Sequence, residues 1–303
     1  MFKNHFIKIS LFCLALIGCL AIILVVLCAK LKVNWLESPS SQPLAENIII
    51  DDVGIKQLFP YLDDLSSVVK DYLIAKDLSK PTKLAINTNI PTSIKANNVI
   101  SLYTPHLTKQ LEARGFNFGS SIVIRIFKVP SILEVWVKKN DRYVLFKTYD
   151  ICRFSGQLGP KTKNGDRQAP EGFYIVYPKQ LNPNSSYFLS FDLGYPNAYD
   201  RYYNRTGNAL MVHGECVSIG CYAMTNSRIA EIYTLMYGAF AAGQSSIQVQ
   251  VYPFALTDNN MRKMKNHKWY SFWTNLKVGY DAFERTRQIS PISVVNGRYQ
   301  FTP

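Results

Sequence analysis

Residues 213–224 read His213-Gly214-Glu215-Cys216-Val217-Ser218-Ile219-Gly220-Cys221-Tyr222-Ala223-Met224, and they are the most informative segment of this 303-residue chain. The segment places an imidazole eight positions before a thiol, with mostly small residues between them. A thiol attacks a carbonyl only as a thiolate, so it needs a neighbouring base to take its proton. His213 can be that base for Cys221. The spacing therefore predicts a cysteine acyl-transfer site.

The residues next to the thiol predict a loop that can stabilise an oxyanion. Gly220 lets the backbone turn sharply and present the N–H groups around residues 220 and 221 to the attacked carbonyl oxygen. Ser218 either supports this loop or closes its turn. Beyond the thiol, apolar residues recur at helical spacing up to Gly243, which predicts a helix with the thiol just ahead of its N-terminus. The apolar positions are Ile229, Ile232, Tyr233, Met236 and Phe240.

Two other interpretations of the same segment stay open. Cys216 and Cys221 can form a local disulfide, or both can join His213 in a metal site. The metal site is the weaker of these, because the chain contains no C-x-x-C pair and no other histidine nearby. The nucleophile hypothesis is favoured over both.

Five further segments upstream of the motif extend the pattern, and the matching region runs from about Phe116 to the C-terminus. With the motif, they resemble the L,D-transpeptidase (YkuD-type) catalytic domain family, specifically its YafK-like murein branch. The upstream segments are residues 125–128, 133–136, 152–161, 170–174 and 193–201.

The resemblance implies a fold and also shows two departures. The expected fold is mainly β with flanking helices (α+β), with a mixed β-sandwich or barrel-like core in which His213 ends one strand and Cys221 lies on the loop beyond. Better-known members carry a second histidine where this chain has Ile219, and an arginine where it has Ala223 and Met224. The Cys–His pair is therefore carried over, whereas the usual substrate contacts are not.

The resemblance also implies an activity. We expect Cys221 to form a thioester at the diaminopimelate carbonyl of a peptidoglycan stem peptide, which an amine or water then resolves. A backbone carbonyl or hydroxyl is expected to orient His213, and neither a metal nor an organic cofactor is expected. The alternative is an amidohydrolase that releases a wall-linked lipoprotein, and a weaker one is a non-catalytic envelope-binding module.

The substrate carries carboxylates, so the site should offer a basic group to them. The candidates lie in segments that match the branch, and surface charge or strand support is the competing explanation for each. These candidates are Arg153, Lys161, Arg201 and Arg205.

The formal net charge of +13 is compatible with nucleic acid, an anionic membrane or an anionic polymer as partner. No zinc-finger spacing, helix-turn-helix pattern or aromatic-basic string is present, which argues against nucleic acid. The basic cluster at residues 262–268 is interpreted as a solvated helix face or a contact with envelope polymer.

The N-terminus predicts an exported protein. Residues 9–29 carry no charge and can cross a bilayer as one helix, so we favour an uncleaved anchor in the inner membrane over a cleaved signal peptide. Lipidation at Cys19 is a weaker alternative, because ten apolar residues follow it. Basic residues flank both ends and leave the orientation open. The resemblance implies that the catalytic part lies on the periplasmic side of the cell envelope.

Four regions are expected along the chain: an anchor or signal segment (1–33), a linker and helical adaptor (34–117), the catalytic domain (118–255) and a C-terminal helical extension (256–303). The adaptor contains a predicted amphipathic helix around 58–73 and a predicted exposed polar loop at 87–98. From residue 121 on, the spacing of apolar residues approaches every second position, which is typical of β-strands. Strands are predicted at 122–127, 132–137, 142–149, 173–177, 187–191, 209–213 and 247–252, the first three as antiparallel hairpins, and a helix at 266–286.

Overall fold

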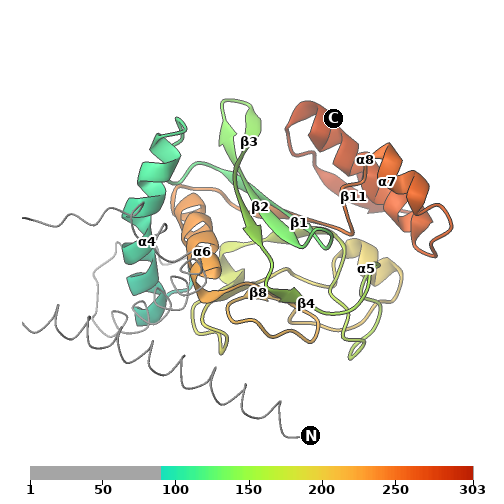
Figure 1. Cartoon of the computed structure of the whole chain (residues 1–303), viewed down its shortest axis with the longest axis horizontal. Helices are drawn as coiled ribbons and strands as arrows, with labels where there is room; N and C mark the ends of the chain where they lie inside the picture. The colour runs from blue at the N-terminus through green and yellow to red at the C-terminus, as the bar shows by residue number, and fades with distance from the viewer. Residues whose placement is uncertain (1–89, 303) are drawn as a thin grey trace, which may run out of the picture. The chain divides into compact units, whose positions relative to one another are not determined.

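The computed structural model describes residues 90–302 (Figure 1). The predicted membrane segment at 9–29 and the predicted helix at 58–73 lie outside these residues. Within residues 90–302, no helix has the length and apolar character needed to cross a membrane.

A five-stranded mixed sheet forms the centre of the described region, in the order β3-β2-β1-β10-β5. Its neighbours pair antiparallel except β1 and β10, which run parallel. Both of these inner strands are buried at every position because other elements cover both faces of the sheet. The predicted antiparallel hairpins are confirmed. The strands are β1 (Ile122–Phe127), β2 (Ile132–Lys139), β3 (Arg142–Asp150), β5 (Gly172–Val176) and β10 (Ile247–Tyr252).

A second sheet of five short strands packs below the first, in the order β4-β9-β8-β7-β6. On one face of this sheet, the side chains of Phe191, Val212 and Tyr222 pack in the main hydrophobic core. Because side chains alternate along a strand, the residues between these point to the opposite face. The strands are β4 (Arg153–Phe154), β6 (Leu181–Asn182), β7 (Ser190–Asp192), β8 (Met211–His213) and β9 (Tyr222–Ala223).

Helices cover both sides of the central sheet, as Figure 1 shows. Helices α4 (Ile94–Glu112) and α6 (Asn226–Ala241) pack together on one side and share the main core with β1 and β10. Helix α8 (Tyr270–Thr286) lies on the other side with the hairpin β11 (Ile292–Val295) and β12 (Arg298–Phe301). This arrangement confirms the predicted α+β class with a mixed β core. The short helices are α5 (Ala198–Tyr202), η1 (Pro178–Gln180) and α7 (Asp258–Lys263).

Helix α6 follows the predicted apolar positions, all of which are buried, and its N-cap Thr225 accepts a hydrogen bond from the Arg228 N–H. Its position relative to Cys221 differs from the prediction. Strand β9 and Thr225 separate the thiol from the helix, which begins at Asn226. A helix dipole acts within about the first turn, so it does not favour the Cys221 thiolate here.

Helix α4 occupies part of the segment that the sequence predicts as an exposed loop. Ser93 caps it by accepting a hydrogen bond of 3.1 Å from the Ala96 N–H, and Ile100 and Leu107 are buried in the main core. Asparagine and proline favour loops in isolation, but burial of this apolar face outweighs that preference. The helix lies within the predicted adaptor, although it packs on the same core as the two sheets.

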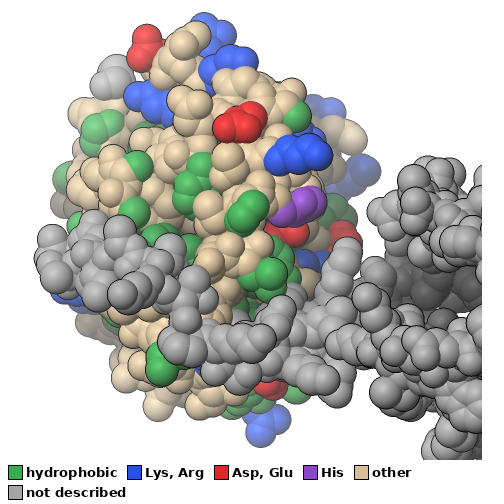
Figure 2. Space-filling model, turned by 90° about the vertical axis from the view of Figure 1, so that its left-hand side faces the viewer, with side chains coloured by type: hydrophobic (Ala, Val, Ile, Leu, Met, Phe, Trp, Pro, Cys, Tyr) green, Lys and Arg blue, Asp and Glu red, His purple; other side chains and the backbone are tan. Residues whose placement is uncertain are grey.

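Charged side chains are dispersed on the face of the molecule in Figure 2, where Lys and Arg alternate with acidic and uncharged residues. The basic cluster at residues 262–268 belongs to α7 and the turn after it. Arg262, Lys263 and Lys268 are exposed there, which fits the predicted solvated face.

Candidate active site

The pairing of β8 with β9 brings Cys221 and His213 to the same face of the small sheet. The two strands run parallel, with Val212 opposite Tyr222 and His213 opposite Ala223. Since Val212 and Tyr222 point into the core, His213 points to the outer face. Cys221 immediately precedes Tyr222, and its Sγ lies 3.4 Å from the backbone N of Met211, the first residue of β8. The imidazole on β8 and the thiol just before β9 therefore lie on this outer face.

The loop before the thiol is closed by Ser218. Its Oγ donates a hydrogen bond of 2.7 Å to the Cys221 carbonyl and accepts one of 3.3 Å from the Gly220 N–H. Gly220 has a φ of +153°, a conformation that favours glycine. Within residues 90–302 the Cys221 N–H donates no backbone hydrogen bond. The turn thus uses the Gly220 N–H internally and leaves that of Cys221 available to a ligand.

His213 is held by the backbone of its own turn. The side chain is buried, and its Nδ1 lies 2.6 Å from the carbonyl oxygen of Gly214. A carbonyl oxygen only accepts hydrogen bonds, so Nδ1 carries the proton and Nε2 keeps its lone pair. The ring of Tyr187 lies against the imidazole, with 4.8 Å between the ring centres. The imidazole is therefore fixed in the form that can take a proton through Nε2.

Burial makes both groups neutral at rest. It lowers the pKa of the His213 imidazole, against the opposing effects of the Gly214 carbonyl and the Glu215 charge. Burial also raises the pKa of the Cys221 thiol, and the nearby Asp192 carboxylate acts in the same direction. The Met211 N–H and the Lys161 charge oppose this rise. A neutral thiol beside a neutral imidazole suits proton transfer during the attack on a carbonyl.

The disulfide in this region differs from the local alternative considered for the motif. Cys216 is bonded to Cys152, at a sequence separation of 64, and Cys221 is a free, half-buried thiol. The structure therefore contradicts the alternative of a local disulfide between Cys216 and Cys221. The observed bond ties the loop between His213 and Cys221 to the residue that precedes β4. Sequence spacing did not indicate it, because the two cysteines are remote along the chain and adjacent only after the sheet forms.

The four basic candidates for substrate binding lie in three different environments. Arg153 is exposed on β4 and pairs in register with Ala223, which itself pairs with His213, so Arg153 shares the outer face with the thiol and imidazole. Lys161 is buried in an ion pair of 2.6 Å with Asp166.

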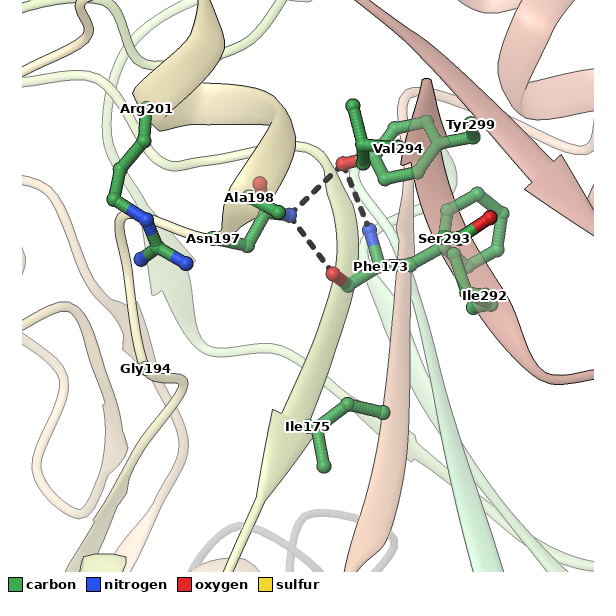
Figure 3. Close-up of a pocket in the computed structure, with 10 residues that line it drawn as sticks. All are labelled: Phe173, Ile175, Gly194, Asn197, Ala198, Arg201, Ile292, Ser293, Val294 and Tyr299. Carbon is green, nitrogen blue, oxygen red and sulfur yellow. Dashed lines mark hydrogen bonds between the residues drawn. The ribbon is translucent and has the colours of Figure 1, made fainter.

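Arg205 is buried and bonded to Asp200 at 2.7 Å, and its guanidinium lies over the ring of Tyr199. Arg201 is exposed, donates a hydrogen bond to the Pro196 carbonyl and lines a separate cavity (Figure 3). Of the four candidates, Arg153 is thus the one on the face of the thiol. Lys161 holds the turn at 161–166, and its charge acts on the Cys221 thiol. Arg205 packs against the aromatic rings of Tyr199 and Phe272.

A buried ion pair that the sequence did not reveal supports the segment 155–171, which lies next to the site. Lys128 Nζ lies 3.0 Å from Glu171 Oε1, with both side chains inaccessible to solvent. Lys128 also donates to the Gly159 and Ala169 carbonyls, and Glu171 accepts from the Gly159 N–H and from Trp273 Nε1. These bonds hold the 155–171 segment. The detectable signal was a charged residue directly after β1 and another directly before β5, two largely apolar strands.

The supported segment contacts the loop between His213 and Cys221 directly. Ser218 Oγ lies 3.4 Å from the Oγ of Ser155, at the start of the segment. Among the described residues, no three His, Cys, Asp or Glu side chains gather in an arrangement that suits a metal ion.

Comparison with known proteins gives matches of two kinds. Residues 131–251 match the L,D-transpeptidase catalytic domain (YkuD). A protein of Escherichia coli K12 named "Putative L,D-transpeptidase YafK" is 51% identical over 181 residues, which are 60% of this chain and 74% of that protein, and its counterpart in the O157:H7 strain matches equally.

Solved structures give more distant matches. The helical cell shape determining protein Pgp2 from Campylobacter jejuni covers 62% of this chain and 80% of its own, with 17% identity and a TM-score of 0.36. Bd1075 from Bdellovibrio bacteriovorus covers 57% and 75%, with 16% identity and a TM-score of 0.31.

Proposed function

Because the chain belongs to the L,D-transpeptidase family, we propose that it modifies peptidoglycan through a thioester on Cys221. The observation that carries this proposal is the free thiol of Cys221 beside the strand of His213, whose Nδ1–H bond to Gly214 leaves Nε2 able to accept a proton. The substrate is a stem peptide that contains diaminopimelate.

The proposed reaction has two halves. In the first, His213 Nε2 takes the thiol proton while Sγ bonds to the diaminopimelate carbonyl carbon, giving a tetrahedral oxyanion that the Cys221 N–H stabilises. Collapse of this species breaks the C–N bond, and His213 returns the proton to the leaving amine. In the second half, an amine or water attacks the thioester, loses a proton to His213, and the Cys221 thiol is restored.

The residues after the thiol favour one of the two acceptors that can resolve the thioester. Ala223 and Met224 stand where better-known members have an arginine, and Ala223 is fully buried. This departure favours water as acceptor, and therefore hydrolysis of an amide at diaminopimelate, including one that joins a lipoprotein to the wall. Transfer to an amine is the alternative. Both versions need the same thioester.

The disulfide supports a location outside the cytoplasm, because such bonds persist in oxidising compartments. We place the catalytic part on the periplasmic side of the envelope, with residues 9–29 as an anchor in the inner membrane. We further propose that residues 34–117 contain the linker to this anchor, and that residues 256–303 form an extension packed on the catalytic domain.

Loss of the thiol tests the proposal. Cys221→Ala should abolish turnover of a diaminopimelate-containing muropeptide, and His213→Gln should lower it by more than about a hundredfold. His106→Ala is the matched control, because His106 is exposed on α4. A carbapenem should form a covalent adduct, detectable by mass spectrometry, that Cys221→Ala removes and Cys152→Ser/Cys216→Ser retains. Turnover by Cys221→Ala would overturn the thioester mechanism.

The acceptor is tested separately. The protein is incubated with a lipoprotein-linked muropeptide, or with tetrapeptide stems and a free amine. Release of the lipoprotein fragment without new cross-links supports hydrolysis. Loss of the terminal D-alanine with a new stem-to-amine bond supports transfer and rejects hydrolysis.

A further inference from the structure

The proposed base, His213, is held by a loop outside its own strand, the β6–β7 loop (residues 183–189). The Gly214 N–H donates hydrogen bonds to two carbonyls of this loop, that of Tyr187 at 3.0 Å and that of Leu189 at 3.1 Å. The Tyr187 ring also lies against the imidazole. The loop therefore restrains the residue whose carbonyl orients the imidazole, and it covers one side of the ring.

The backbone of Gly214 packs tightly against this loop. A Cβ at this position would lie 2.8 Å from the Tyr187 carbonyl oxygen, 3.0 Å from Phe188 Cβ and 2.5 Å from Asn226 Oδ1. Closely packed groups transmit displacements to one another, so a shift of the loop backbone moves Gly214 as well. The Gly214 carbonyl oxygen lies 2.6 Å from His213 Nδ1. The position of the loop thus controls the geometry of that bond.

Helix α4 holds the β6–β7 loop through two side chains at its N-terminal end. Lys95 Nζ donates a hydrogen bond of 3.1 Å to the Ser185 carbonyl. Ser93, the N-cap, donates one of 3.0 Å from its Oγ to the Pro183 carbonyl. The Lys95 ammonium also lies 5.9 Å from the centre of the Phe188 ring. The helix therefore contacts the loop at three of its residues.

Lys95 keeps its ammonium partly buried without a carboxylate partner. Burial lowers the pKa of this lysine, and no charge of the described residues opposes that effect. The bond to Ser185 is therefore the main polar contact of the ammonium, and Ser185 is itself buried. Ser185 Oγ accepts a hydrogen bond of 3.1 Å from the Tyr187 N–H. A displacement of Ser185 is thus passed directly to Tyr187.

We propose that Lys95 is a positioning residue for His213. Its ammonium fixes the Ser185 carbonyl, and the β6–β7 loop then places the carbonyl and the ring of Tyr187. Gly214, held by that carbonyl, keeps the proton on Nδ1 and leaves Nε2 able to accept the thiol proton. The inference rests on the proposed function for the role of His213. It makes α4, which lies in the predicted adaptor, a support of the site.

The tautomer of His213 tests this role without any substrate. The full chain is labelled with histidine enriched in the NMR-active nitrogen isotope, and the signals of His213 are identified by their absence from His213→Gln. At a pH where the ring is neutral, we expect the native protein to carry the proton on Nδ1. In Lys95→Met, both ring-nitrogen signals should move toward the mean of the two tautomers. Lys95→Arg keeps a charged donor and should restore the native signals.

Kinetics on a muropeptide give a second readout. Lys95→Met should lower kcat about tenfold and leave KM within about twofold, because the chemical step depends on the geometry of the base while the substrate contacts stay. Lys109→Met is the matched control, since Lys109 is an exposed lysine in the last turn of the same helix. It should change neither kcat nor the ring signals. Thermal melts of each variant separate lost positioning from lost folding.

Two results would overturn the positioning role. One is the native ring signals in Lys95→Met, whatever the kinetics show. The other is an equal change in Lys109→Met, which would assign the effect to the stability of α4. A changed tautomer with unchanged turnover would instead support the positioning and reject His213 as the base. Failure of the proposed function is therefore distinguishable from failure of this inference.

Discussion

The Gly214 carbonyl oxygen lies 2.6 Å from His213 Nδ1, so a backbone group performs the orienting role that a carboxylate performs in many triads. The acceptor belongs to the next residue of the same turn, and the imidazole is buried against Tyr187. A neutral acceptor adds no negative charge that would stabilise an imidazolium. Burial outweighs the pKa-raising effects of this bond and of the Glu215 charge, which keeps the imidazole neutral and ready to accept a proton.

The pH dependence of turnover should reflect this neutral base. Because burial lowers the pKa of His213, the imidazole stays unprotonated to lower pH than a free one. We expect kcat/KM for a muropeptide to keep its plateau down through the ordinary imidazole value of about 6.5 and to fall only below it. The test is a pH profile of kcat/KM in buffers of constant ionic strength. An acid limb centred above that value would show that a charged neighbour, not burial, controls this histidine.

Most of the architecture was predictable from periodicity, because β1, β2, β3, β10 and α6 are long and continuously patterned. The C-terminal hairpin β11–β12 was missed, since each of its strands is only four residues long and gives too short a pattern. At the site, the His–Cys spacing predicted the pair because both residues lie on one short segment. The Cys152 bond and the Lys128–Glu171 pair depend on contacts between segments remote in sequence, which spacing does not reveal.

The disulfide should stabilise the fold and position the catalytic loop. Cys152→Ser/Cys216→Ser should lower the free energy of unfolding by about 2–4 kcal/mol, measured by urea denaturation. It should also lower kcat about tenfold or more, because the loop between His213 and Cys221 loses its attachment to β4. A reductant should reproduce both effects in the native protein and have none on the double variant. Equal stability and kcat in the two proteins would make the bond incidental.

Gly220 should matter for catalysis more than for stability. Its added Cβ would meet nothing nearer than Leu210 at 3.5 Å, so Gly220→Ala acts through the φ of +153° alone. Relaxation of that strain, about 1–3 kcal/mol, would rotate the peptide that carries the Cys221 N–H and lower kcat. Gly165→Ala is the matched control, with a φ of +74° and open space around it. We expect similar losses of stability, measured by thermal unfolding, but a lower kcat only for Gly220→Ala. A similar fall in kcat in both variants would contradict this role.

Arg153 should bind a substrate carboxylate rather than take part in bond making. It is the third member of a row with His213 and Ala223 across neighbouring strands, which places its Cα about 10 Å from that of His213. An exposed arginine side chain on this face can pair with a carboxylate of the bound substrate.

Arg153→Gln should therefore raise KM about tenfold and leave kcat within about twofold, as expected when an interaction is equal in the ground and transition states. Tenfold corresponds to about 1.4 kcal/mol, near the lower end for a hydrogen bond to a charged group. Steady-state kinetics on a muropeptide measure the split, and Arg262→Gln on α7, also an exposed arginine, is the control. Arg153→Lys should restore part of the affinity, because the charge remains while the planar guanidinium is lost. A fall in kcat with unchanged KM would instead place Arg153 among the groups that act on the transition state.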